Sequence, residues 1–253
     1  MYAKGIEALG CMKYFEHCSC CAVPSRFARA EFTATGHSCQ LYTTLAAGQG
    51  LCRLRVHKPD EKFDKTSDLG SPPSEYAKTS IRMSAAGISA FYGAFDRETT
   101  IRETASGITE PAAATLGTFR ALRDLRLVDL TNVPHLPSIF DSEFRGLRPG
   151  IRFLRGFLND FTAPVVKDGR EHIDYVPTQV IAEYLRFIHR DQEGRPIDGI
   201  LYNRAQHEGA QACVLFFGPE GACDPGEETG RTALVLESAV RLELAPGQPK
   251  HAA

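Results

Sequence analysis

Alternating and continuous apolar runs predict a series of short β-strands along this chain. Residues 51–56 alternate so that Arg53 and Arg55 share one face with Leu51, a period of two that is typical of a strand. Uninterrupted runs of bulky apolar residues are typical of buried strands. Further strands are therefore expected at 88–95, 125–130, 199–202 and 212–217, and a last alternating strand at 233–244 is expected to close the sheet.

Apolar residues at near-helical spacing predict helices between these strands. Residues 139–161 carry such a pattern, interrupted by Pro149-Gly150, so two helices are expected there. Pro177 is placed near the start of another helix, whose expected core-facing stripe consists of Val180, Ile181, Tyr184, Leu185 and Ile188. Strands and helices in this order predict an α+β fold, with a mixed or antiparallel central sheet and flanking helices.

The pattern divides the chain into three parts. Residues 1–48 form a weakly patterned leader, residues 49–245 a single domain, and residues 246–253 a tail that is expected to be disordered. Within the domain, the polar stretch 57–81 contains Gly70-Ser71-Pro72-Pro73. Because long loops inside a domain are usually functional or mobile, we expect this stretch to be an ordered loop that runs to the functional site.

Composition narrows the class of protein. The chain has 253 residues and a net charge of −2, so its charge balance does not predict a nucleic-acid partner. No apolar run reaches the roughly eighteen residues of a membrane span. The N-terminus lacks the basic and apolar regions of a secretory signal, so a cytoplasmic protein is expected.

The cysteines raise the question of a metal site. Six of them lie within the first 52 residues, and Cys18 and Cys21 form a C-x-x-C pair close to His17. A zinc site normally needs a second pair at regular spacing, and His37 with Cys39 provides only a poor one. Structural zinc in the leader is one reading and an unstructured leader is the other; we predict no metal. Cys213 and Cys223 are interpreted as core or loop thiols.

Residues 82–103 contain the main candidates for a ligand-binding or catalytic site. Arg82 precedes a turn rich in small residues, Tyr92 lies on the predicted strand that follows, and Asp96 is a plausible N-cap for a helix that contains Glu103. A cation, an aromatic ring and a carboxylate brought together in this way would suit a ligand with phosphates, a flat ring and a sugar. The alternative is that Arg82 is a surface residue, Tyr92 a core residue and Glu103 a solvated helix residue.

Four segments, in this order, resemble the RES domain family. They are Arg53-Leu54-Arg55; residues 69–73 with 82–88; residues 91–94 continuing to Glu103; and residues 174–179 with 199–202 and 214–216. The likeness covers roughly residues 50 to 220. Carried over by motif position, Arg53 corresponds to the first arginine of the family, Arg82 to the arginine before the turn, Tyr92 to the strand tyrosine and Glu103 to the helix glutamate.

The resemblance implies an ADP-ribosyltransferase-like fold and an enzyme that cleaves the nicotinamide–ribose bond of NAD by hydrolysis or phosphorolysis. NAD would be a substrate, with no resident cofactor or metal. The resemblance also implies the toxin of a toxin–antitoxin pair and a homodimer. Guanidinium groups bind pyrophosphate through forked hydrogen bonds, which suits Arg53 and Arg82. Tyr92 would stack on nicotinamide, and Glu103 would stabilise the positive charge that develops on the ribose.

One motif departs from the family pattern. A serine is expected about two residues after the strand 199–202, and this chain has Asn203-Arg204-Ala205 there. Either Asn203 or Arg204 contacts phosphate in its place, or the site retains binding with weakened turnover. The alternative function is therefore a catalytically weakened NAD-binding regulatory module.

Overall fold

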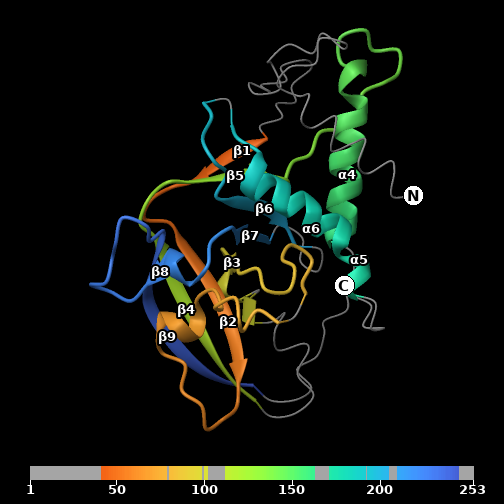
Figure 1. The fold of residues 1–253 in the computed structure, drawn as a ribbon. Coiled ribbons are helices and arrows are strands. Elements are labelled where there is room, and N and C mark those ends of the chain that lie inside the picture. The colour runs from red at the N-terminus through yellow and green to blue at the C-terminus, as the bar shows by residue number, and fades with distance from the viewer. Residues whose placement is uncertain are drawn as a thin grey trace. The chain divides into compact units, whose positions relative to one another are not determined.

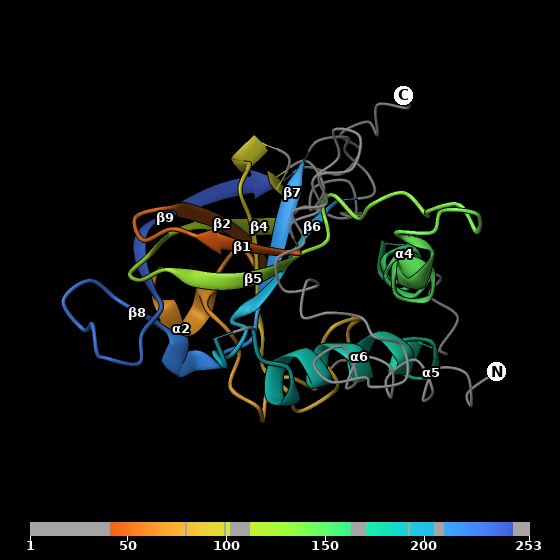
Figure 2. The same cartoon turned by 90° about the horizontal axis from the view of Figure 1, so that it is seen from above.

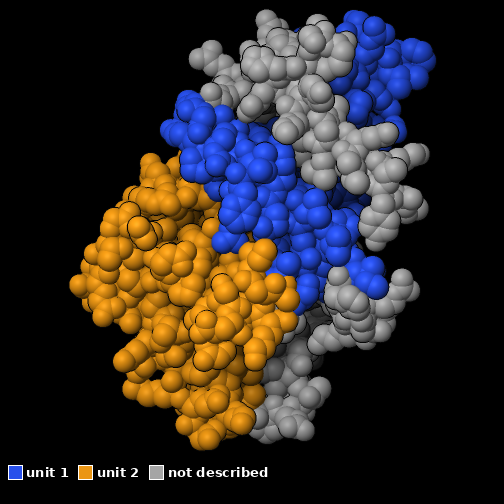
Figure 3. Space-filling model, viewed as in Figure 1, with its two compact units in different colours: residues 1–43, 80–85, 128–197 blue, residues 44–79, 86–127, 198–253 orange. Residues whose placement is uncertain are grey.

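The computed structural model describes residues 41–78, 80–98, 100–101, 112–162, 171–191, 193–204 and 210–244. The chain divides into two compact units, shown in different colours in Figure 3. Unit 1 consists of residues 1–43, 80–85 and 128–197, and unit 2 of residues 44–79, 86–127 and 198–253. The leader up to residue 40 and the tail from residue 245 lie outside the described residues. Among the candidate site residues, Glu103 also lies outside them.

The described strands form one sheet in the order β1-β5-β6-β7-β3-β2-β4-β9-β8 (Figure 1). The named pairs of β2, β3, β4, β6, β7 and β9 are antiparallel, whereas β8 and β9 are parallel. The sheet is thus mixed, as the sequence predicts. The strands are β1 (Tyr42–Leu45), β2 (Gly50–His57), β3 (Phe91–Ala94), β4 (Ala112–Ala121), β5 (Leu125–Asp129), β6 (Gly199–Asn203), β7 (Gln211–Leu215), β8 (Ala222–Cys223) and β9 (Leu234–Leu244).

Strand β4 is the longest of the strands that the sequence pattern did not predict. It pairs with β2 along one edge and with β9 along the other, with a bulge between Thr118 and Phe119. Its residues 113–117 are all buried. Alanine is depleted in strands, so the run of alanines that opens β4 gives no local strand signal. Its place between two long partner strands and its burial decide its structure.

The remaining predicted strands are confirmed with small changes of bounds. The strand predicted at 88–95 is shortened to β3, and the one predicted at 233–244 is β9, which lies next to β8 at the edge of the sheet. The stretch 57–81 includes a single helical turn, α2 (Thr66–Leu69). Strand β1 precedes residue 49, at which the sequence pattern places the start of the domain.

The core of unit 2 is built on the aromatic rings of the sheet. Phe91 and Phe119 are fully buried and meet edge to face, with ring centroids 5.0 Å apart. Gly199 allows β6 to approach β7 closely, because a Cβ at this position would lie 2.2 Å from the carbonyl oxygen of Val214. Cys213 is fully buried among these residues, which confirms its interpretation as a core thiol.

Unit 1 contains the long helix α4 (Arg148–Thr162), preceded by the short turn η2 (Arg145–Leu147). The prediction of two helices separated at Pro149 is wrong. Pro149 lies in the first turn of α4, where the missing N–H has no helical partner to lose. Phe140, which the pattern counted as a helical apolar position, precedes both elements and is 88% exposed.

The other helical elements of unit 1 follow one another along the chain. They are α5 (Glu171–Asp174), α6 (Val176–Glu183) and the π-helical turn η3 (Tyr184–Ile188). Figure 2 shows α4 end-on and α6 lengthwise, so these two helices cross. Ile181 and Leu185 are buried as predicted, but Val180 and Ile188 are exposed, so two members of the predicted core stripe are wrong. None of the described helices is long and apolar enough to cross a membrane.

Candidate functional site

A pocket of about 300 Å³ opens in unit 2 beside strand β2. Arg53 and Arg55 are two residues apart on that strand, so their side chains leave the same face of the sheet. They pair across the ladder with Gly117 and Thr115 of β4, which fixes their register. The pocket is lined by Cys52, Arg53, Leu54, Arg55, Tyr92, Thr100 and Arg204. None of these lining residues is acidic and three are arginines.

Arg53 holds a half-buried positive charge. Its guanidinium carbon lies 5.0 Å from the centroid of the Phe91 ring, a cation–π contact. Its Nη1 atom is buried and has no hydrogen-bond partner within the described parts of the chain. Burial, followed by the charge of Arg55, lowers the pKa of Arg53 to about 9. A buried cation with an unused donor costs free energy until an anion reaches it.

Arg55 is held more firmly but also keeps a free donor. Its Nη2 atom donates to the carbonyl oxygen of Gly70 at 2.8 Å. Its Nε atom is buried and, among the described residues, finds no acceptor. Burial lowers the pKa of Arg55, and Asp68 partly opposes that shift. The polar stretch 57–81 therefore does reach the site, because Gly70 anchors this arginine.

Tyr92 and Arg204 complete the pocket from neighbouring strands. Tyr92 lies on β3, opposite Val214 of β7. Arg204 directly follows β6, and its backbone N–H donates to the carbonyl oxygen of Ala210 at 2.8 Å. Asn203 is exposed at the end of β6 and does not line the pocket. The structure thus brings Arg53, Tyr92 and Arg204 together and leaves Asn203 outside.

Thr100 lies in the first turn of the helix that the sequence predicts after β3. Its backbone N–H and its Oγ1 atom both donate to the carbonyl oxygen of Asp96, at 3.2 and 2.7 Å. This is the first helical hydrogen bond after an N-cap at Asp96, as predicted. Thr100 lines the pocket; the sequence placed it in the first turn of the predicted helix but gave it no role at the site. The carboxylate of Glu103, three residues further on, lies outside the described residues.

Arg82 belongs to unit 1, and its contacts there are structural. Its guanidinium carbon lies 5.3 Å from the centroid of the Tyr175 ring, and its Nη1 atom donates to the carbonyl oxygen of Asp160. Its own carbonyl oxygen accepts a hydrogen bond of 2.5 Å from Thr178 Oγ1. These contacts fix both the backbone and the side chain of the arginine that precedes the turn.

Gln179 fastens the same turn. The sequence placed it in the segment 174–179 that carries the RES resemblance but assigned it no role. Its Nε2 atom donates to Ser80 Oγ at 2.6 Å and to the carbonyl oxygen of Ile81 at 2.8 Å. Gln179 is buried at 7% exposure. Two adjacent polar residues, Thr178 and Gln179, near the start of an otherwise apolar helix are the signal that could have identified this anchor.

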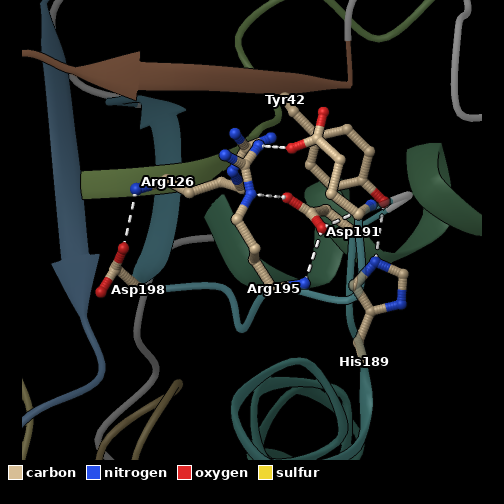
Figure 4. Close-up of polar contacts among 7 residues, drawn as sticks. Tyr42, Arg126, His189, Asp191, Arg195 and Asp198 are labelled. Carbon is tan, nitrogen blue, oxygen red and sulfur yellow. Dashed lines mark hydrogen bonds and ion pairs between the residues drawn. The ribbon is translucent and has the colours of Figure 1, made fainter. Parts of the chain in front are cut away.

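Two further groups of polar contacts, one in each unit, are drawn in Figure 4. In unit 1, Tyr42 and His189 share a hydrogen bond of 2.8 Å, and the carboxylate of the buried Asp191 accepts from the backbone and the guanidinium of Arg195. In unit 2, the carboxylate of Asp198 accepts from the backbone N–H of Arg126 at 2.8 Å. These contacts hold loops in place. Within the described chain, no group of three or more His, Cys, Asp or Glu side chains could hold a metal ion.

Comparisons with known proteins give the family. A chain of the MbcT–MbcA toxin–antitoxin complex of M. tuberculosis matches with a TM-score of 0.42 and 17% sequence identity, covering 79% of this chain and 86% of that chain. A likeness of this size carries no information on activity. No curated protein sequence matches the chain. The family model described as the RES domain matches residues 52–233, more than two thirds of the sequence. The chain therefore belongs to the RES domain family.

Proposed function

We propose that the pocket of unit 2 binds the phosphates of NAD and that the protein cleaves the nicotinamide–ribose bond. The observation that carries this proposal is the pair of half-buried arginines on β2, Arg53 and Arg55. Each keeps a buried N–H donor without a partner among the described residues. Guanidinium groups are suited to phosphate because several N–H donors lie in one plane.

The remaining lining residues fit the rest of such a ligand. The ring of Tyr92 offers a stacking surface for nicotinamide, which is cationic until it leaves. Arg204 supplies a third cation at the place where the family serine is absent. A volume of about 300 Å³ is at the lower end for ligand sites, which suits one half of a dinucleotide better than the whole molecule.

The proposed reaction breaks the C–N bond between ribose and nicotinamide, and the bonding electrons leave with nicotinamide as a neutral base. Water then gives ADP-ribose and a proton, whereas phosphate gives a ribosyl phosphate. Glu103 is the proposed carboxylate that stabilises the developing positive charge on the ribose. It is separated by three residues from Thr100, and three residues span at most about 11 Å.

Further elements of the hypothesis rest on the family resemblance alone. They are an ADP-ribosyltransferase-like fold, a toxin held by an antitoxin, and a homodimer. A cytoplasmic location is a further proposal. Direct binding of NAD by Arg82 or Asn203 is also retained as a proposal. The second candidate function is NAD binding without turnover, which the absence of a serine in residues 203–205 favours.

Loss of NAD from a solution of the full-length protein, with and without phosphate, tests the proposal. We expect Glu103→Gln to lower the rate by on the order of a hundredfold, and Arg53→Met to weaken binding of ADP-ribose. Arg120→Met is the matched control, because Arg120 lies on β4 and pairs with Glu237 at the surface.

The outcomes separate the two candidate functions. NAD loss that requires Glu103 supports the enzyme, and a dependence on phosphate identifies the acceptor. Binding of NAD without loss supports the binding module. If wild type neither binds nor consumes NAD, both are wrong.

A further inference from the structure

The solvent-facing side of the helical segment formed by α5, α6 and η3 is apolar along its length. Five large apolar side chains on it are exposed by between 38% and 59%. They are Ile173, Val176, Val180, Phe187 and Ile188. Single exposed apolar residues are normal, whereas a continuous patch marks an interaction site.

The spacing of these residues places them on one face. At about 100° per residue, all five fall within an arc of roughly 120°, and Pro177 and Tyr184 fall within the same arc. The opposite arc carries the buried side chains of Tyr175, Thr178, Ile181, Ala182 and Leu185. A surface helix normally directs its polar side outward, and this one is apolar on both sides.

The π-helical turn at the end of the segment adds to the exposed face. The backbone N–H of His189 donates to the carbonyl oxygen of Tyr184 at 2.8 Å, five residues back along the chain. Such turns occur frequently at functional sites. Phe187 and Ile188 are more exposed here than any of the three preceding members of the face.

The charges that border the face are acidic over most of its length. Asp174 is exposed and Glu183 is half-buried, and the sequence from Ile173 to Leu185 contains no lysine or arginine. The arginine that follows, Arg186, has its guanidinium carbon 5.2 Å from the centroid of the Phe187 ring. A partner would therefore meet an apolar stripe with negative borders.

We propose that this face binds a single amphipathic helix of a partner protein, with apolar residues at three- and four-residue spacing and lysines or arginines along its edges. The stripe from Ile173 to Ile188 is about 22 Å long at 1.5 Å per residue, a length that one helix of about four turns covers. The intervals of three, four and seven residues between Ile173, Val176, Val180 and Phe187 are those at which two helices pack.

A second copy of this chain fits the face less well. Pairing about a two-fold axis near Val180 would place the two Glu183 carboxylates on the same side of the interface. Five partly exposed side chains also supply much less than the roughly 800 Å² per partner of a stable interface. The proposal is independent of the NAD hypothesis, since no residue of the face lines the pocket of unit 2.

Two synthetic helical peptides test the proposal with the full-length protein. Both have about three heptads with leucine at the a and d positions; one carries lysine along the edges and the other glutamate. We expect the lysine-edged peptide to bind at least tenfold more tightly in fluorescence anisotropy. Val180→Ser with Phe187→Ser should weaken that binding at least tenfold. Ile139→Ser with Phe140→Ser, exposed elsewhere in unit 1, is the matched control.

Charge reversal provides a readout that unfolding would not imitate. Asp174→Lys with Glu183→Lys should reverse the preference, so that the glutamate-edged peptide binds more tightly. Equal binding of both peptides to wild type, or unchanged binding to the Val180/Phe187 variant, would overturn the proposal. If neither peptide binds, two other results would also overturn the proposal. They are a doubled mass in light scattering and sedimentation of the protein with phosphatidylserine vesicles, in either case lost in the Val180/Phe187 variant.

Discussion

Replacing Arg53 by methionine should stabilise the unliganded protein while removing its affinity for a phosphate-bearing ligand. Methionine keeps the length and the apolar stem of the arginine and removes the buried charge. It also removes a donor, Nη1, that lacks a partner within the described chain. Replacement of buried ionic groups by apolar side chains of similar volume is often neutral or stabilising.

The magnitude follows from the surroundings of the guanidinium. Burial and the charge of Arg55 lower the pKa of Arg53 to about 9, which, measured against the ordinary value for arginine, corresponds to roughly 5 kcal/mol against the charged form at 1.36 kcal/mol per pH unit. The contact with the Phe91 ring offsets about 2 kcal/mol of this. We therefore expect Arg53→Met to stabilise the protein by about 1–3 kcal/mol, and to raise Tm by roughly 3–10 °C for a chain of this size.

Thermal unfolding with and without ADP-ribose or pyrophosphate is the assay. Wild type should gain Tm as either ligand is added, since a ligand that binds only the folded state stabilises it by mass action. The Tm of unliganded Arg53→Met should be higher than that of wild type, and either ligand should raise it only a little. Arg120→Met should behave as wild type, because exposed ion pairs such as Arg120–Glu237 contribute little.

A lower Tm for unliganded Arg53→Met would refute the reasoning. It would mean that a carboxylate of the chain already pairs with Arg53, because breaking a buried pair leaves the other charge unpaired and destabilises strongly. Glu103 would then be the first candidate. Arg53→Met combined with Glu103→Gln would test this, because removing both partners should restore the lost stability.

Three further substitutions or reactions test the fold and the site. Gly199→Ala should destabilise by on the order of 3 kcal/mol in urea unfolding, since its Cβ would lie 2.2 Å from a carbonyl oxygen of β7; a loss below 1 kcal/mol would contradict this packing. Gln179→Leu should cost about 1–3 kcal/mol and speed hydrogen exchange in residues 80–85, and unchanged exchange would exclude it as an anchor. Alkylation of Cys52, whose pKa is raised by burial, should accelerate as the pH rises through and above 9, because more thiolate forms, and ADP-ribose should slow it. Cys213, fully buried and with its pKa raised to about 12 by burial, should stay unlabelled in the same peptide-resolved mass spectra, and its labelling in folded protein would contradict that burial.

The sequence predicted part of the site because the relevant residues lie on elements with strong local signals. Alternation identified β2, and a period of two places Arg53 and Arg55 on one face whatever the rest of the chain does. Neither Thr100 nor the anchoring carbonyl oxygen of Gly70 could be found in this way. Thr100 lines the pocket, and the carbonyl oxygen of Gly70 accepts a hydrogen bond from Arg55. Both placements depend on contacts between segments that are far apart in sequence.

Arg82 and Val180 show what a correctly read local pattern leaves undecided. Both belong to patterns that the sequence read correctly as local structure, a turn and a helix. Local pattern cannot say what a side chain packs against, and Arg82 contacts Tyr175 and Asp160 while Val180 faces outward. The apolar residues of α6 exceed what one buried face can hold, so the tertiary structure decides which of them remain outside.

The sequence by itself determined the mixed α+β class, most strands and the segments that carry the RES resemblance, because period, turn residues and motif order are local properties. Only the tertiary structure decided that the alanine-rich β4 is a central strand. It also decided that Arg53 and Arg55 are half-buried and that each keeps a buried N–H donor without a partner among the described residues. The exposed apolar face of α5, α6 and η3 was likewise decided by the tertiary structure. Burial and hydrogen-bond satisfaction depend on what the rest of the fold places around a residue, and no local pattern contains that information.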